Sequence, residues 1–157
     1  MAKVLVVYES KYGNTRLVAE KIIEGMKQVS GLEAELAEVK KVALDRLAQF
    51  DAILTGSPNH MGRATGSIRK FIDSLGKLNL EGKKIAVFDT YMGADFEKAV
   101  KKMEKQIKEK APQLKLIAPG LSIRVAGMKG PVAEGELDRS KDFGSKIASL
   151  LHTGHNS

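Results

Sequence analysis

Short strand-like segments, most of them apolar, alternate with longer amphipathic segments, and this alternation constrains the fold more than any other feature of the sequence. The strand-like segments are residues 3–8, 32–38, 52–56, 84–88 and 114–125, the last interrupted by Pro119-Gly120. The helix-like segments are residues 14–29, 65–75, 95–110 and 137–151, with a weaker helical turn at 43–50. Apolar strands separated by helices indicate a parallel sheet that is covered on both faces.

Right-handed crossovers between such strands produce a doubly wound sheet. We therefore expect an α/β three-layer sandwich with a five-stranded parallel sheet in the order 2-1-3-4-5. Ligands of this architecture bind outside the carboxyl ends of the strands, where the strand order reverses. The loops after the first, third and fourth strands should therefore line one site.

Length and composition limit the classes of protein that fit. At 157 residues, 43% of them hydrophobic, the chain suits one domain, expected over residues 1–151, with a disordered tail at 152–157. The absence of cysteine excludes disulfides, thiolate catalysis and cysteine-ligated metals. No leader pattern and no apolar run near the roughly 20 residues of a membrane span are visible, so we expect a cytoplasmic monomer or weak dimer without bound metal.

The formal charge of +7 raises the question of nucleic-acid binding. Lysines are dense between residues 98 and 110, but glutamates are interleaved, and Glu97 with Lys101 and Glu104 with Lys108 are spaced for ion pairs along a helix. Aromatic residues, which would stack on bases, make up only 5% of the chain. We therefore expect no nucleic-acid partner, and an acidic protein partner fits the charge better.

The first of the three loops has the composition of an anion site. It reads Ser10, Lys11, Tyr12, Gly13, Asn14 and Thr15, and passes directly into a helix-like segment. A central glycine lets the backbone curl so that amide hydrogens point inward, and the helix adds its positive end. The dinucleotide and nucleoside-triphosphate fingerprints are both absent, so another phosphate is expected. Ser10 and Asn14 also suit simple helix capping.

The second and third loops carry less specific signals. The second loop includes Pro58, Asn59, His60, Met61 and Gly62, and the third includes Thr90, Tyr91, Met92 and Gly93. Taken alone, Tyr91 suits a half-buried surface position, Met61 a gap-filling role and His60 no role at all. Asp89 and Asp95 suit fixing the third loop or capping the helix that follows, and Asp95 in particular has the position of a cap.

At these three loops the sequence resembles the flavodoxin family, from residue 3 to about residue 151. The first loop is similar to the family's phosphate loop for FMN, which implies FMN as cofactor. The resemblance implies donors from Ser10, Asn14 and Thr15 and from the amides of the three residues between Ser10 and Asn14. The Tyr-Gly pair and the Gly56-Ser57-Pro58 run are also similar to the flavodoxin domains of flavodiiron proteins.

The Met61-Gly62 pair resembles that of short-chain flavodoxins, whose peptide beside the glycine turns over on one-electron reduction of the flavin. The resemblance implies that Met61 packs on one flavin face and Tyr91 on the other, with backbone groups of residues 90–93 near the pyrimidine edge. Arg63 stands where those relatives have an acidic residue. A basic domain should disfavour the anionic reduced flavin less than an acidic one does.

These features predict an FMN-dependent electron-transfer protein that shuttles electrons between redox partner proteins, which the charge predicts to be acidic. We expect a carrier rather than a turnover enzyme. The alternative is an NAD(P)H-dependent quinone reductase of the same fold, which Gly56-Ser57-Pro58, His60 and Arg63 also resemble. A third hypothesis is a binding module without flavin. A phospho-acceptor receiver is excluded because no aspartate stands at the end of the third strand.

Overall fold

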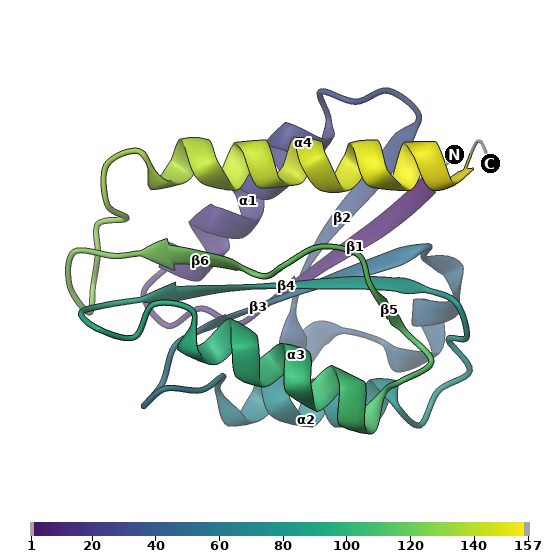
Figure 1. The fold of residues 1–157 in the computed structure, drawn as a ribbon, viewed down its shortest axis with the longest axis horizontal. Coiled ribbons are helices and arrows are strands. Elements are labelled where there is room, and N and C mark those ends of the chain that lie inside the picture. The colour runs from purple at the N-terminus through teal and green to yellow at the C-terminus, as the bar shows by residue number, and fades with distance from the viewer. Residues whose placement is uncertain (1, 156–157) are drawn as a thin grey trace.

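A parallel β-sheet runs through the middle of the molecule, with helices on both faces (Figure 1). The computed structural model describes residues 2–155. Its strands are β1 (Ala2–Tyr8), β2 (Leu32–Glu38), β3 (Ala52–Pro58), β4 (Lys84–Tyr91), β5 (Lys115–Leu116) and β6 (Leu121–Arg124). Its helices are α1 (Asn14–Met26), α2 (Gly66–Leu75), α3 (Lys98–Lys110) and α4 (Glu136–His155), and the 3₁₀ helices η1 (Val39–Lys41) and η2 (Leu44–Gln49). None of the helices described is both long and apolar enough to cross a bilayer.

The strand order β2-β1-β3-β4-β5 confirms the predicted topology, and every pairing of these strands is parallel. The fifth strand differs from the prediction because it is divided into β5 and β6, which both pair with β4. At the break, the backbone N–H of Gly120 donates to the Glu104 carboxylate at 3.0 Å. Glu104 is therefore committed to the break, and the predicted pair with Lys108 does not form, whereas Glu97 and Lys101 do pair, at 3.7 Å.

Three helix ends differ by three residues or more from the sequence-based expectation. Helix α1 ends at Met26 rather than at residue 29. Helix α3 begins at Lys98 rather than at Asp95, and the Asp95 side chain contacts Asn59 and Lys98 instead of capping the helix. Helix α4 continues to His155, so the first part of the expected tail at 152–157 lies in this helix. The last two residues of that tail lie outside the described residues.

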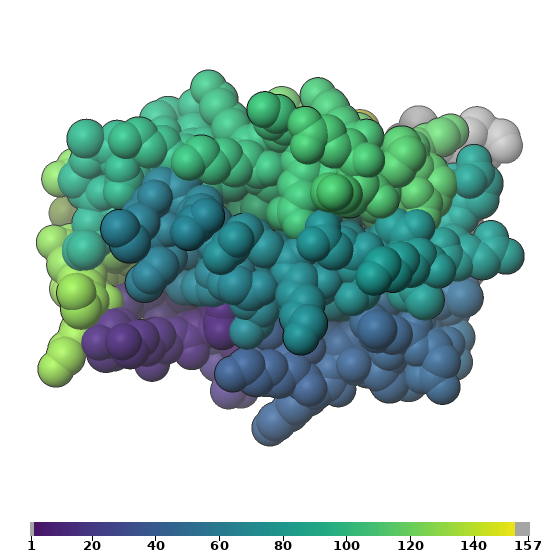
Figure 2. Space-filling model, turned by 90° about the horizontal axis from the view of Figure 1, so that it is seen from below, coloured from purple at the N-terminus to yellow at the C-terminus, as the bar shows by residue number. Residues whose placement is uncertain are grey.

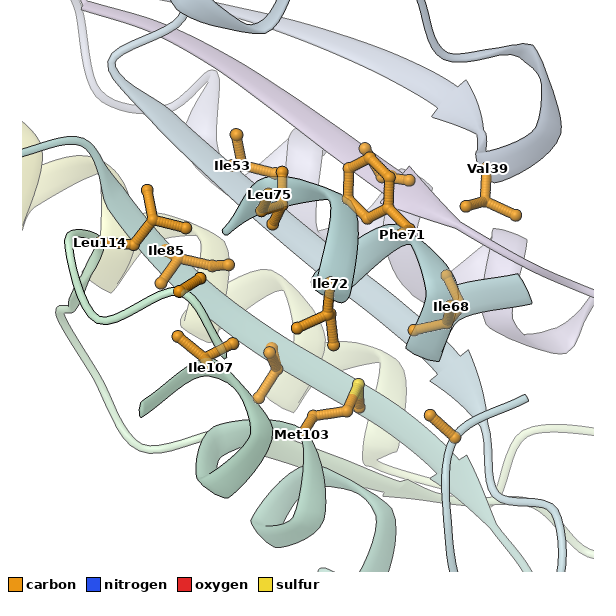
Figure 3. Close-up of a cluster of buried hydrophobic side chains, with 14 of the residues drawn as sticks. Val39, Ile53, Ile68, Phe71, Ile72, Leu75, Ile85, Met103, Ile107 and Leu114 are labelled. Atoms are coloured by element: carbon orange, nitrogen blue, oxygen red, sulfur yellow. The ribbon is translucent and has the colours of Figure 1, made fainter. Parts of the chain in front are cut away.

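The apolar core has one part on each face of the sheet. Below the sheet in Figure 1, Ile68 and Ile72 of α2 and Met103 and Ile107 of α3 pack against strand residues such as Ile85 (Figure 3). Full burial of side chains of this size stabilises the fold by about 1.5–3 kcal/mol each. These contacts fix α2 and α3, and with them the loops that lead into both helices.

Helices α1 and α4 cover the other face and approach each other closely (Figure 1). A Cβ at Gly144 would lie 1.9 Å from the carbonyl oxygen of Ile22, and a Cβ at Gly25 would lie 1.9 Å from that of Lys141. The Ser145 hydroxyl also donates to the carbonyl of Gly25 at 3.0 Å. The absence of side chains at the two glycines therefore sets the spacing of this helix pair.

A buried aspartate near the end of β4 fixes the segment between β4 and α3. One oxygen of the Asp89 carboxylate accepts from the N–H of Val100 at 3.0 Å, in the first turn of α3. The other accepts from the Ser122 hydroxyl of β6 at 2.6 Å, and that hydroxyl in turn accepts from the N–H of Glu97 at 2.9 Å. Asp89 thus caps α3 from β4. This contact agrees with the prediction that Asp89 caps the helix that follows the third loop.

Replacing Gly144 by alanine should destabilise the fold by about 3 kcal/mol, because the added methyl forces α1 and α4 apart. The matched control is Gly66→Ala, also in a helix, where the nearest atom to the new Cβ is Arg69 Nη2 at 3.8 Å. That variant should be neutral or more stable by about 0.5 kcal/mol. Urea unfolding followed by circular dichroism measures both, and equal midpoints for the two variants would contradict the proposed contact.

Burial raises the pKa of the Asp89 carboxyl from 3.8 to about 6, against the opposing hydrogen bonds from Ser122 and Val100. The folded protein therefore holds this proton more tightly than the unfolded chain, so the contribution of Asp89 to stability falls as pH rises from about 4 to about 6. The shift corresponds to about 3 kcal/mol. Relative to Asp89→Asn, wild type should lose about that much unfolding free energy across this range. Urea unfolding of both proteins at several pH values measures the difference in unfolding free energy between them. A difference that stays constant across this pH range would contradict the prediction.

Candidate functional site

The candidate site lies where the strands end. The register pairs Tyr8 of β1 with Gly56 of β3, and Gly56 with Phe88 of β4, so the chain leaves these strands at one edge of the sheet. Four loops meet there, at the left end of Figure 2, in purple, blue, green and yellow-green. They enclose a cavity of about 590 Å³.

Twelve of the fifteen residues predicted for the site line this cavity. They are Ser10, Lys11, Tyr12, Asn14, Thr15, Pro58, Asn59, His60, Met61, Thr90, Tyr91 and Met92. The other three are glycines that do not line it, and each has a positive φ: 90° at Gly13, 84° at Gly62 and 62° at Gly93. These glycines therefore shape the loops rather than face the cavity.

Five lining residues were not predicted: Glu9, Thr65, Asp95, Val125 and Met128. Val125 and Met128 belong to a fourth loop, residues 125–132, which follows β6. The rule that ligands lie at the carboxyl ends of parallel strands applies to this loop as well, so its position was available from the sequence. A Cβ at Gly130 would lie 2.6 Å from Asn14 Oδ1, which shows how closely this loop packs on the first.

The first loop forms an open cradle of backbone donors. Gly13 has a φ of 90°, and a Cβ there would meet nothing within 4 Å. The Ser10 hydroxyl accepts from the N–H groups of Gly13 at 3.0 Å and Arg16 at 3.3 Å, so Ser10 does cap α1. Five N–H groups of this segment have no partner within residues 2–155, those of Ser10, Lys11, Tyr12, Asn14 and Thr15. Free donors at a helix N-terminus favour an anion.

The second loop contains a tight two-residue turn. The backbones of His60 and Arg63 bond to each other in both directions, at 2.7 Å and 3.2 Å. Met61 and Gly62 between them have φ values of 55° and 84°, as a type I′ turn requires. The Met61 side chain is 86% exposed, so it fills no gap in the protein. A Cβ at Gly62 would lie 3.6 Å from Lys102 Nζ, which places this ammonium beside the turn.

The third loop presents an aromatic side chain. Tyr91 is half-buried and lines the cavity, and its ring meets that of Phe96 edge-on, with centroids 5.5 Å apart. Burial, followed by the charge of Glu136, raises the pKa of the Tyr91 hydroxyl, which keeps this group neutral. Beside it, the hydroxyls of Thr90 and Thr15 lie 2.9 Å apart, so the third loop is tied to the first.

Asn59 and Asp95 tie the second loop to the third. The Asn59 side-chain N–H donates to the Asp95 carboxylate at 2.8 Å, and the Asn59 backbone N–H donates to the carbonyl of Thr90 at 2.7 Å. Asp95 also pairs with Lys98 at 3.0 Å, and this hydrogen bond lowers the pKa of the Asp95 carboxyl. The side-chain oxygen of Asn59 is buried and accepts no hydrogen bond from the described residues.

A carboxylate lies in the same cavity as the backbone donors. Glu9 accepts from the hydroxyl of Thr65, and the backbone N–H of Thr65 donates to the Ser57 hydroxyl at 3.0 Å. The cavity therefore offers a ligand both donors and an acceptor. Within residues 2–155, no three histidine, aspartate or glutamate side chains gather in a way that could hold a metal ion.

Comparison with known proteins identifies the chain's relatives. A family model described as a flavodoxin domain matches residues 5–127. A protein named NAD(P)H dehydrogenase (quinone), from Geotalea daltonii, is 35% identical over 107 residues, which are 53% of this chain and 52% of that protein. A flavodoxin from Aquifex aeolicus is 33% identical over 96 residues, 59% of this chain and 52% of that protein. The chain thus spans about half the length of the curated relatives it matches.

Among solved structures, one described as a flavodoxin from the domain Archaea has a TM-score of 0.81 and 28% sequence identity. The likeness covers 96% of this chain and 99% of that one. The strand order, the position of the cavity and the family model, which matches most of the chain, all agree. The chain belongs to the flavodoxin family.

Proposed function

We propose that residues 1–151 form an FMN-binding domain that works in the cytoplasm as an electron carrier between redox partner proteins. The single observation that carries this proposal is the meeting of four strand-end loops around one cavity, which is surrounded by both free backbone donors and exposed apolar side chains. When bound, the isoalloxazine ring of FMN accepts and releases electrons one or two at a time. Membership of the flavodoxin family supports the same assignment.

The phosphate of FMN would lie in the cradle of the first loop. The unpartnered N–H groups of Asn14 and Thr15 open α1, where the helix dipole favours negative charge. Asn14 itself lines the cavity, and the Ser10 hydroxyl can turn from its capping bonds toward a phosphate oxygen. The cradle thus fits a monophosphate because its backbone N–H groups and the Ser10 hydroxyl can bind the phosphate oxygens without an ion pair to lysine.

The flavin ring would lie between Tyr91 and the exposed thioether of Met61. Tyr91 lines the cavity, and the T-shaped contact with Phe96 holds its ring in place. The backbone of residues 90–93, the Asn59 amide and the Glu9 carboxylate supply polar groups of both kinds for a ring that has donors and acceptors. Lys102 lies beside the Met61-Gly62 turn and Arg63 follows it in the chain, and both cations favour added negative charge near the turn.

A quinone reductase that uses NAD(P)H is the second candidate, because a relative with that name is 35% identical to part of this chain. The two functions differ in what reduces the flavin. Adding NADPH to the FMN-loaded protein without a reductase should leave the flavin absorbance unchanged for a carrier. Rapid bleaching under these conditions would favour the reductase and contradict the carrier assignment.

Replacing Ser10 by alanine should weaken FMN binding by about ten- to a hundredfold, because a hydrogen bond to a charged group contributes about 1.5–3 kcal/mol. Riboflavin lacks the phosphate, so its affinity should change little. Calorimetric titration of the apoprotein with each flavin measures both affinities.

The matched control for this experiment is Ser74→Ala in α2, where the hydroxyl bonds only to the carbonyl of Lys70. This variant should bind both flavins as wild type does. The assignment of the first loop would be wrong if Ser10→Ala reduced FMN and riboflavin affinity equally. If the wild-type protein took up neither flavin, the proposed function itself would fail.

A further inference from the structure

Exposed apolar side chains gather around the cavity, and one of them does not line it. The residues that form this group, called here the apolar cluster, are Tyr12, Met61, Met92, Phe96 and Met128. Within the described residues, only two other large apolar side chains are exposed, Leu44 and Leu150. Phe96 is 50% exposed but does not line the cavity, so a ligand in the cavity would not account for its position. An apolar patch of this kind marks an interaction surface.

Positive charge surrounds the apolar cluster. Several cationic side chains on the same loops, or beside them, have no ion-pair partner within residues 2–155, and four of these are Lys11, Arg63, Lys102 and Lys129. Lys11 lies over the Tyr12 ring, with Nζ 5.4 Å from its centroid, and Lys102 lies beside Gly62.

The acidic groups of this edge are in large part neutralised by neighbours. Asp95 pairs with Lys98, Glu97 with Lys101 and Glu136 with Arg139. The cations at this edge therefore exceed the unpaired carboxylates there. A partner whose own surface is acidic would gain from this field, whereas a basic partner would be repelled.

We propose that the apolar cluster and its four free cations form the docking surface for an acidic electron-transfer protein that has carboxylates around an apolar patch. This inference rests on the proposed function, because it gives the chemistry of the carrier's partner. Three of the five apolar residues are methionines, whose flexible thioethers adapt to surfaces of different shape. One surface can therefore receive an electron donor and an electron acceptor in turn.

The test measures binding of two probe proteins to the FMN-loaded protein by NMR titration. An acidic [2Fe–2S] ferredoxin should bind and shift the resonances of Phe96, Lys102 and Met128. Basic cytochrome c should bind far more weakly. The ferredoxin affinity should fall by about tenfold or more when salt is raised from about 20 mM to about 200 mM, because the Debye length shortens.

Charge reversal locates the surface. Arg63→Glu combined with Lys102→Glu should weaken ferredoxin binding by about tenfold or more. The control combines Lys27→Glu and Lys77→Glu, which change the net charge equally at exposed positions after α1 and α2. This control should weaken binding much less than the first double variant does, because its charges lie beyond the C-terminal ends of α1 and α2, away from the docking surface, and are screened more strongly.

The docking proposal is overturned if cytochrome c binds more tightly than ferredoxin at low salt, if ferredoxin does not bind, or if the two double variants lose affinity equally. Flavin content is measured for every variant beforehand, and the titration is repeated with the apoprotein. A chain that takes up no flavin but still binds ferredoxin through Phe96 and Lys102 would contradict the proposed function while supporting the docking surface. A protein that binds FMN but does not bind ferredoxin would contradict the docking surface while supporting the proposed function.

Discussion

Parallel pairing of β1, β3 and β4 in a single register is the constraint on which the candidate site depends. Because Tyr8, Gly56 and Phe88 lie side by side, the residues after them emerge together at one edge. Gly56 permits this register, since a Cβ there would lie 2.0 Å from the Phe88 ring. Glycine at this position thus serves packing within the sheet and not a turn.

Long-range polar contacts then set the positions of the loops. Asp89 joins β4 to α3 and β6, Asn59 joins the second loop to Asp95 in the third, and Thr15 joins the first to Thr90. Apart from the bond between Asp89 and α3, these contacts link segments that are far apart in the sequence but meet at the same edge of the sheet. The cavity is consequently framed by loops that are tied to one another within the folded chain.

The sequence was sufficient for the strand order because the apolar segments and the crossovers between them have strong local signals. It was less informative where tertiary contacts decide. The break between β5 and β6 depends on Glu104 reaching Gly120, and the start of α3 depends on Asp89 rather than on the nearby Asp95. Glu9 and Thr65 enter the site through a contact between the first and second loops that no local pattern announces.

The fourth loop was missed for a different reason. Its residues, among them Val125 and Met128, have neither the hydroxyls nor the aromatic side chain that drew attention to the other loops. Only its position after the last strand marks it, and this position follows from topology rather than from composition.

The left-handed backbone of Met61 bears on how readily the second loop can rearrange. A φ of 55° costs a residue with a side chain about 1–2 kcal/mol, which glycine would not lose. That free energy is recovered if the turn moves to a conformation with negative φ at Met61. A ligand that draws the turn into such a conformation would therefore meet a smaller net penalty here than in a chain with glycine at both central positions.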